Sequence, residues 1–240
     1  MRIDRMLANS GYGTRSEVRK MISRGLFCVN GTVVKDPSFA VNENDIVTAG
    51  DKEISSRSNL YYKLDKPDCY LTAMEDKRLP TVADLIPSNI RTKKISPVGR
   101  LDYHTTGLLI LTNDGKLSHR LTSPRYDVPK TYLIGYSGDA LGQEHVRMFS
   151  EGIVLEDTDG KIPLKPASLR LIDDNTCELT ITEGKTHQVR RMLAKFGRSV
   201  ITLRRIRIGN ITVDGLREGI PEEMTDDEIT ELKRALGIST

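Results

Sequence analysis

One aspartate of this 240-residue chain stands where it could act as a catalytic carboxylate. Asp102 ends the tetrapeptide Gly-Arg-Leu-Asp, and the apolar run 108–111 follows shortly after it, which predicts a loop that leads into a buried strand. A carboxylate in such a loop can act as a nucleophile or as a general base. The pattern equally suits a turn aspartate bonded to nearby backbone amides, which is the more ordinary interpretation of Asp102 alone.

Two later segments carry residues that suit the same site. Lys130, Thr131 and Tyr132 open a predicted strand, and a tyrosine there presents a flat ring on which a planar ligand can stack. A core tyrosine at the start of a strand is the structural alternative. The segment 183–192, EGKTHQVRRM, predicts a helix whose apolar side chains face inward while its basic side chains project outward.

In this order, the three segments resemble the pseudouridine synthases of ribosomal RNA. The resemblance implies that Asp102 is the catalytic aspartate, that Tyr132 packs against the target base and that Arg190 pairs with Asp102. An arginine suits that pairing because its planar fork binds a carboxylate bidentately and keeps its charge when partly buried. The stretch 117–125, LSHRLTSPR, is most similar to members that act on small-subunit (16S) rRNA.

The implied reaction converts uridine to pseudouridine: the N-glycosidic bond is cut, the uracil turns, and the sugar is rejoined to it through carbon. No atoms enter or leave, so we expect neither a cofactor nor a metal, and the sequence has no P-loop, GxGxxG fingerprint or metal-ligand spacing. Three roles fit Asp102: attack on C1′ of the ribose, addition to the uracil ring, or removal of a sugar proton. His187 could serve as a general base, but the resemblance gives proton handling to Asp102.

Basic residues are concentrated in two segments, although the formal net charge is only +3. Residues 2–24 hold six basic side chains against two acids, residues 185–207 hold eight and no acid, and residues 214–231 hold eight acids against one arginine. Either basic run alone is most simply a solvated surface, but together with the three segments they favour contact with RNA phosphates. The residues expected to contact RNA are Arg2, Arg5, Arg15, Arg19, Lys20, Arg24, Arg100, Lys130, Lys185, His187, Gln188, Arg191, Arg204 and Arg205.

The first fifty or so residues predict a small RNA-binding domain. Helical spacing of apolar residues predicts a helix over 3–9, and Thr14 with Glu17 has the form of a capping box for a second helix. The segment 26–34 predicts two strands joined by an Asn30-Gly31 turn, and 45–48 a further strand. This order resembles the S4 RNA-binding domain, which we place at 1–55, with a polar linker at 55–59. Together with the three segments above, it resembles the S4-domain-bearing RsuA family.

The remaining residues, 60–240, are expected to form the catalytic domain. Periodicity predicts strands at 60–64, 107–112, 132–136, 167–172, 178–181 and 200–208, and helices at 116–122, 140–150 and 225–236. Regular alternation of strands and helices is absent, which disfavours a doubly wound parallel sheet. The prediction is therefore an α+β fold with a mixed, largely antiparallel sheet.

Cysteine usage and hydropathy indicate the cellular compartment and whether the chain enters a membrane. The widely separated Cys28, Cys69 and Cys177 are expected to be small core residues of a reducing cytoplasm, not zinc ligands or disulfides. Structural roles are also expected for the remaining histidines, His104, His119 and His145. No apolar segment approaches the roughly 18 residues that a bilayer span needs. We expect a cytoplasmic monomer that binds 16S rRNA or an assembling small ribosomal subunit and no membrane.

Other functions fit parts of the pattern. A non-catalytic RNA-binding or ribosome-assembly factor would keep the basic segments without turnover, and a synthase of the same family could act on 23S rRNA instead. An S4-bearing enzyme of different chemistry, such as a methyltransferase, would need a glycine-rich nucleotide site, which the sequence does not show. The presence of Asp102, Tyr132 and Arg190 together favours the catalytic interpretation.

Overall fold

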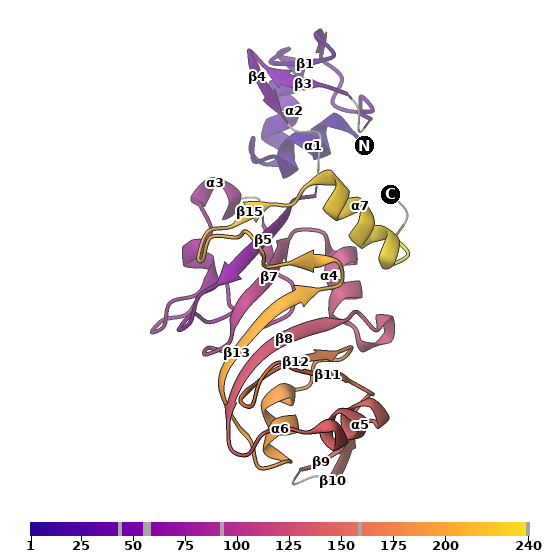
Figure 1. The fold of residues 1–240 in the computed structure, drawn as a ribbon. Coiled ribbons are helices and arrows are strands. Elements are labelled where there is room, and N and C mark those ends of the chain that lie inside the picture. The colour runs from indigo at the N-terminus through magenta and orange to yellow at the C-terminus, as the bar shows by residue number, and fades with distance from the viewer. Residues whose placement is uncertain (43–44, 55–58, 92–93, 158–159, 239–240) are drawn as a thin grey trace. The chain divides into compact units, whose positions relative to one another are not determined.

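The computed structural model describes residues 1–42, 45–54, 59–91, 94–157 and 160–238 (Figure 1). These residues form two compact units, one of residues 1–60 with 87–95 and the other of 61–86 with 96–240. The predicted linker at 55–59 lies almost wholly outside the described residues, and the domain limits 1–55 and 60–240 stay a prediction.

Unit 1 begins with two helices, which are followed by an antiparallel sheet of four short strands in the order β2-β1-β3-β4. Thr14 and Glu17 form the predicted capping box at the start of α2, and Asn30 (φ 50°) and Gly31 (φ 78°) form the predicted tight turn between β1 and β2. Strand β4 was not predicted. The elements are α1 (Ile3–Asn9), α2 (Arg15–Ser23), β1 (Phe27–Val29), β2 (Thr32–Val34), β3 (Val47–Ala49) and β4 (Lys52–Ile54), with α3 (Ser88–Arg91) in the second segment.

Unit 2 is built around one large sheet with the central order β11-β12-β8-β13-β7-β5-β15. Its strands are β5 (Tyr61–Lys66), β6 (Ser96–Pro97), β7 (Thr106–Thr112), β8 (Lys130–Ser137), β11 (Ser168–Leu171), β12 (Thr176–Ile181), β13 (Ser199–Ile208), β14 (Ile211–Thr212) and β15 (Glu222–Glu223). A separate hairpin is formed by β9 (Val154–Asp157) and β10 (Gly160–Pro163). Its helices are α4 (Gly115–Thr122), α5 (Gln143–Glu151), α6 (Gln188–Ala194) and α7 (Asp226–Ala235), with 3₁₀ turns at Val82–Leu85 and Pro124–Tyr126.

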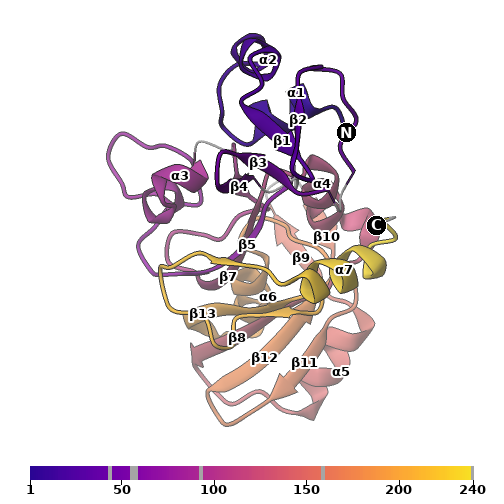
Figure 2. The same cartoon turned by 90° about the horizontal axis from the view of Figure 1, so that it is seen from above.

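The sheet of unit 2 is antiparallel except where β13 runs parallel to β7. Strands β8 and β13 are long, curved neighbours that cross the middle of the unit (Figures 1 and 2). The predicted α+β class with a largely antiparallel sheet is confirmed. Strands β6, β9, β10, β14 and β15 were not predicted, because segments of two to four residues show too little periodicity.

The core of unit 2 holds the strands that carry the candidate site. Leu108 and Ile110 of β7 are fully buried, and they belong to one apolar cluster with Leu117 of α4 and Leu232 of α7. The closing helix begins with the predicted capping box, in which the Thr225 hydroxyl accepts from the backbone N–H of Glu228. No helix among the described residues is long and apolar enough to cross a membrane.

Candidate active site

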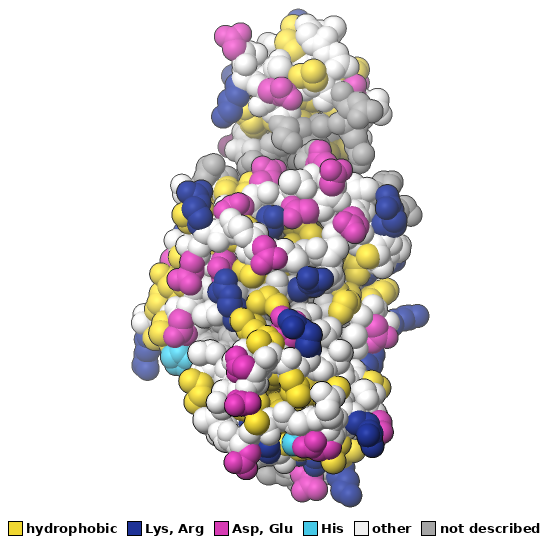
Figure 3. Space-filling model, viewed as in Figure 1, with side chains coloured by type: hydrophobic (Ala, Val, Ile, Leu, Met, Phe, Trp, Pro, Cys, Tyr) yellow, Lys and Arg dark blue, Asp and Glu magenta, His cyan; other side chains and the backbone are white. Residues whose placement is uncertain are grey.

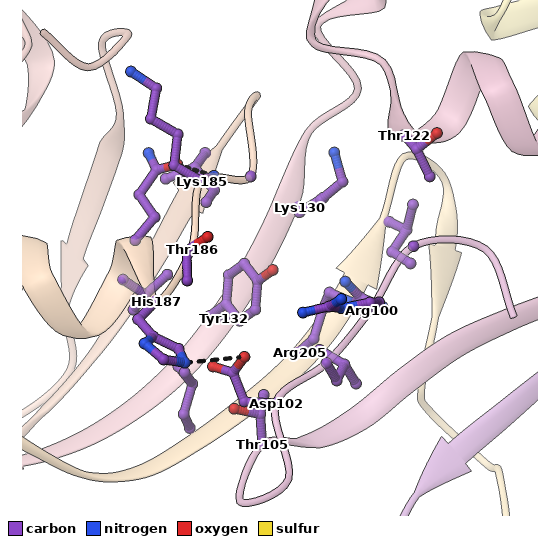
Figure 4. A pocket seen from close by; sticks show the side chains of 18 of the residues that line it. Arg100, Asp102, Thr105, Thr122, Lys130, Tyr132, Lys185, Thr186, His187 and Arg205 are labelled. Atoms are coloured by element: carbon purple, nitrogen blue, oxygen red, sulfur yellow. Dashed lines mark hydrogen bonds and ion pairs between the residues drawn. The ribbon is translucent and has the colours of Figure 1, made fainter. Parts of the chain in front are cut away.

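A pocket of about 440 Å³ opens in unit 2 beside the segment that carries Asp102. Its walls come from the loop before β7, the start of β8, the loop that leads into α6, and β13. Figure 4 shows side chains from these elements converging on one space. The candidate residues that line it are Arg100, Asp102, Lys130, Tyr132, Lys185, His187, Gln188 and Arg205, with Thr105 as a residue that the sequence analysis did not single out.

The loop that carries Asp102 is held at both ends. Thr72 accepts from the Leu101 N–H at 3.1 Å and donates its hydroxyl to the Leu101 carbonyl at 2.7 Å, while the Thr105 N–H donates to the Asp102 carbonyl at 3.0 Å. Beyond it, Gly107 (φ 99°) pairs with Arg205 of β13, and a Cβ at Gly107 would stand only 2.2 Å from the Arg205 carbonyl oxygen. Close strand pairing therefore fixes the turn that presents the carboxylate.

Asp102 faces His187 across the pocket. The His187 Nε2 lies 3.6 Å from the Asp102 Oδ1, a contact that Figure 4 marks with a dashed line. The side chains of His187 and Asp102 are 59% and 40% exposed. His187 takes a left-handed conformation (φ 50°) directly before α6, which is uncommon for a residue with a Cβ. The carboxylate is thus accessible from the pocket and has a histidine as its neighbour.

Arg190 differs from its expected position. Its guanidinium donates from Nη1 to the Val200 carbonyl at 3.2 Å and from Nη2 to the His104 carbonyl at 3.4 Å, and in the described chain the ion pair of Asp102 is with His187. From the first turn of α6, the Arg190 guanidinium reaches Val200 at the start of β13 and His104, two residues after Asp102. Its donors are therefore bonded to backbone carbonyls. The expected Asp102–Arg190 pair is therefore not formed in this structure, and Arg190 supports the Asp102 turn from behind.

The loop that leads into α6 is organised by a buried network that the sequence did not reveal. Gln188 is 3% exposed; its Oε1 accepts from the Lys185 N–H at 2.9 Å and its Nε2 donates to Glu183 Oε1 at 2.9 Å. Glu183 also accepts from the Lys165 N–H at 3.0 Å. Both polar atoms of Gln188 are bonded within the protein and shape the loop, and the expected contact of Gln188 with RNA stays a prediction.

Tyr132 and Lys130 form the β8 side of the pocket. The Tyr132 side chain is almost fully buried within the wall (8% exposed), a position from which its ring can support a flat ligand. Burial, and secondarily the charge of Arg205, lowers the pKa of Lys130 to about 8, while its ammonium donates to the Val128 carbonyl at 3.2 Å. An ammonium in this position would gain from an anionic ligand.

Two buried polar atoms of the pocket wall have no hydrogen-bond partner among the described residues. They are Nη2 of Arg205 and Oγ1 of Thr105. Arg205 is 3% exposed and its Nε donates to the Leu108 carbonyl at 2.8 Å. Because an unpaired buried donor costs roughly 1–3 kcal/mol, these groups suit a ligand that supplies the missing partners.

Other residues of unit 2 that were expected to contact RNA are bonded to protein groups in the structure. Arg204 pairs with the buried Asp65 at 2.6 Å, and Arg191 pairs with Asp157 at 2.9 Å, so neither guanidinium lies in the pocket. Lys185 lines the pocket but its ammonium donates to the Pro163 carbonyl at 2.8 Å. On the face of unit 2 seen in Figure 3, basic and acidic side chains are interspersed and form no continuous basic surface.

The predicted basic cluster of unit 1 is organised around an acid. The side chain of Asp4 is fully buried and pairs with Arg2, Arg15 and Arg19 at 2.9–3.1 Å, while these arginines are about half exposed. Burial of the carboxyl alone would raise the pKa of Asp4, but hydrogen bonds from Arg15 and Arg19 outweigh it and lower the pKa to about 2. The remaining basic residues of this segment, Arg5, Lys20 and Arg24, are exposed.

One expectation about the cysteines was wrong, and one histidine lies in a grouping that the sequence did not show. Cys69 is exposed, whereas Cys177 is buried, with a pKa raised by burial to about 11. His104, expected to show no metal-ligand grouping, lies with Asp68 and Cys69 in a cluster of metal-ligating atom types. Residues 68–69 and 104 are far apart in sequence, so only the fold could bring them together.

Comparison with known proteins agrees with this arrangement. Residues 60–195 match the RNA pseudouridylate synthase family, and residues 1–47 match the S4 domain. The chain belongs to the RNA pseudouridylate synthase family. It is thus an RNA pseudouridine synthase with an S4 domain in front, as the sequence segments predicted.

Relatives of this synthase match it over nearly their whole length. A Bacillus subtilis protein named "uncharacterized RNA pseudouridine synthase YtzG" is 37% identical over 236 residues, which cover 95% of this chain and 97% of that one. The ribosomal small subunit pseudouridine synthase A of Haemophilus influenzae is 36% identical over 234 residues (97% and 99%). A solved pseudouridylate synthase, 35% identical, superposes with a TM-score of 0.67 and covers 97% of this chain and 99% of that one.

Proposed function

We propose that this synthase isomerises a single uridine of small-subunit (16S) ribosomal RNA, with Asp102 as its catalytic carboxylate. The choice of RNA rests on the relatives of similar length named ribosomal small subunit pseudouridine synthase A, from Haemophilus influenzae and Escherichia coli. Those relatives are named for the small ribosomal subunit, so we expect the enzyme to act in the cytoplasm, on rRNA or on an assembling subunit. That it works as a monomer stays a prediction.

The observation that carries this proposal is the position of Asp102. Its carboxylate is 40% exposed on a tethered turn at the wall of a pocket that also contains the ring of Tyr132. A pocket of about 440 Å³ falls within the range of small-molecule sites, and it is large enough for a nucleobase with its sugar. The target nucleotide would have to leave its stack to enter, at a cost of a few kcal/mol.

The residues of the pocket have different roles in the proposed reaction. The Tyr132 ring supports the flipped uracil, and the unpaired Arg205 Nη2 and Thr105 Oγ1 are available to its oxygens or to the sugar. Asp102 assists cleavage of the bond between C1′ and N1, after which the uracil turns and C5 bonds to C1′. The proton lost from C5 and the proton gained by N1 balance, so the product is an isomer of the substrate.

Lysine and arginine side chains supply the electrostatic part of binding. Arg100, Lys130 and Lys185 surround the pocket, and in unit 1 three arginines around one buried aspartate leave an excess of positive charge. Each phosphate that these groups neutralise steepens the salt dependence of binding, by about 0.7–0.9 in a log–log plot.

The experiment that tests the substrate assignment is tritium release from RNA labelled with [5-³H]uridine. Small-subunit rRNA, large-subunit rRNA and assembling small subunits are compared, and the modified position is then mapped by carbodiimide labelling and primer extension. Release from small-subunit RNA at one position supports the proposal. Release from large-subunit RNA alone would instead assign the enzyme to 23S rRNA, and binding of all substrates without release would favour a non-catalytic factor.

A further inference from the structure

The cluster formed by Asp68, Cys69 and His104 lies outside the substrate pocket and is not used by the reaction described above. All three residues are exposed, and one ligand atom from each lies within 4.8 Å of the others. We propose that these three side chains form a binding site for a divalent transition-metal ion such as Zn²⁺.

The types of donor atom define the class of ion. The cluster offers a thiol sulfur, an imidazole nitrogen and a carboxylate oxygen, a combination that suits Zn²⁺ and related ions far better than Mg²⁺ or Ca²⁺. Three protein ligands leave a position for water, which completes the tetrahedral shell that zinc prefers. Since the thiol binds as thiolate, loading the site releases a proton to solvent.

The distances between the ligand atoms fit one small ion. The His104 Nδ1 is 3.1 Å from the Asp68 Oδ1 and 3.9 Å from the Cys69 Sγ. Zinc bonds of about 2.0–2.3 Å at tetrahedral angles place such atoms roughly 3.3–3.6 Å apart. The third pair, from Asp68 and Cys69, lies within 4.8 Å, so rotation of these exposed side chains would bring the ligand atoms to zinc distances.

The backbone already holds the two segments of the cluster together. The Cys69 N–H donates to the Tyr103 carbonyl at 3.2 Å and to the Asp68 Oδ1 at 2.8 Å, and the Lys66 ammonium also donates to the Tyr103 carbonyl, at 3.3 Å. Cys69 is held in the left-handed region (φ 61°), where a residue with a Cβ is uncommon. A pre-formed cluster loses little conformational entropy when it takes up an ion.

The arrangement is less well explained by hydrogen bonding alone. The single nitrogen His104 Nδ1 faces both the carboxylate and the sulfur, and in neutral histidine it carries at most one proton. A cation at the common centre would instead satisfy all three lone pairs at once. The exposure of the side chains leaves the ion an open path from solvent.

The test is metal titration of the untagged full-length chain in a buffer with a non-chelating reductant. Zn²⁺ binding is measured by competition with a chromophoric chelator, and Co²⁺ is used as a spectroscopic probe of thiolate ligation. We expect one equivalent of tightly bound ion, a near-ultraviolet thiolate-to-cobalt band, and no competition from a large excess of Mg²⁺.

Matched variants separate this site from the other thiols and histidines. C69S should abolish the cobalt band and H104Q should weaken Zn²⁺ binding by at least about tenfold, whereas C28S and H119Q should bind as the native chain does. The three ligands are exposed, so these variants should keep the native melting temperature. Stoichiometric binding that survives in the triple variant D68N/C69S/H104Q, or a native chain that binds no more Zn²⁺ than that variant, would overturn the proposal.

Discussion

Asp102 and His187 approach to 3.6 Å, and Arg190, although only three residues further along, is bonded to the carbonyls of Val200 and His104 instead. The loop before α6 therefore places His187 beside the Asp102 carboxylate, while Arg190 is bonded to backbone carbonyls. These positions give the two basic residues different expected effects on turnover.

Replacement of His187 should weaken catalysis without abolishing it. A partly exposed contact of 3.6 Å orients the carboxylate only modestly, so H187A should lower kcat/KM by about tenfold, or about 1.4 kcal/mol. Single-turnover assays on labelled RNA measure this, with H119A at an exposed histidine outside the pocket as the control. A loss as large as that of an Asp102 variant would instead make His187 the general base.

Replacement of Arg190 should affect both the Asp102 turn and the fold. R190M removes two hydrogen bonds from a charged donor, which costs about 1–3 kcal/mol of stability and loosens the turn that carries Asp102. We expect a lower melting temperature together with at least a tenfold loss of kcat. K195M, at an exposed position just after α6, serves as the control. Unchanged stability combined with a full loss of activity would favour direct contact between Arg190 and Asp102 during turnover.

Lys130 should make the free energy of unfolding depend on pH. Its pKa of about 8 in the folded chain lies below the ordinary value of 10.5, so between these pH values the folded state binds fewer protons than the unfolded state. The free energy of unfolding should therefore rise from pH 8 to 10.5, and K130M should lack Lys130's share, on the order of 1 kcal/mol for a partly exposed group.

Urea titrations at several pH values measure this rise in the native chain and in K130M. K116M, at an exposed lysine, should follow the native curve. An identical pH profile for native chain and K130M would refute the assigned burial effect.

Asp4 should behave as the organising acid of unit 1. D4N leaves three arginines without their partner and should destabilise this unit by about 1–2 kcal/mol, because those arginines are only half buried. The pKa of about 2 predicts that the native contribution is present above pH 4 and is lost as the pH falls toward 2.

Hydrogen exchange of unit 1 amides at neutral pH measures the effect, with the exposed D51N as the control. Equal protection in D4N and D51N would show that the cluster is not structural. RNA affinity should also fall in D4N, because the arginines lose their fixed positions.

Local signals predicted much of the fold. The Thr14–Glu17 capping box and the Asn30-Gly31 turn depend on residues close in sequence, and both are formed as expected. Short edge strands could not be predicted, because their pairing is decided by neighbours in the sheet. The buried Gln188–Glu183 network was missed for a related reason. Two polar residues five positions apart are expected to lie at the surface unless their burial is known.

The sequence predicted most of the residues that line the candidate site, but not which of them contact one another. The segments around Asp102, Tyr132 and the loop before α6 do meet in one pocket, although they are distant in sequence. The left-handed backbone conformation of His187 decides which basic residue faces Asp102. This conformation cannot be predicted from the residue type. The cluster of Cys69 with His104 likewise arises only from tertiary structure.

The most direct test of the central claim compares the native chain with D102N. The two side chains have nearly the same shape, so RNA binding and melting temperature should stay close to native, while tritium release from [5-³H]uridine rRNA should disappear. That result would establish Asp102 as the catalytic carboxylate of this synthase. Tritium release by D102N at a rate near that of the native chain would contradict the account.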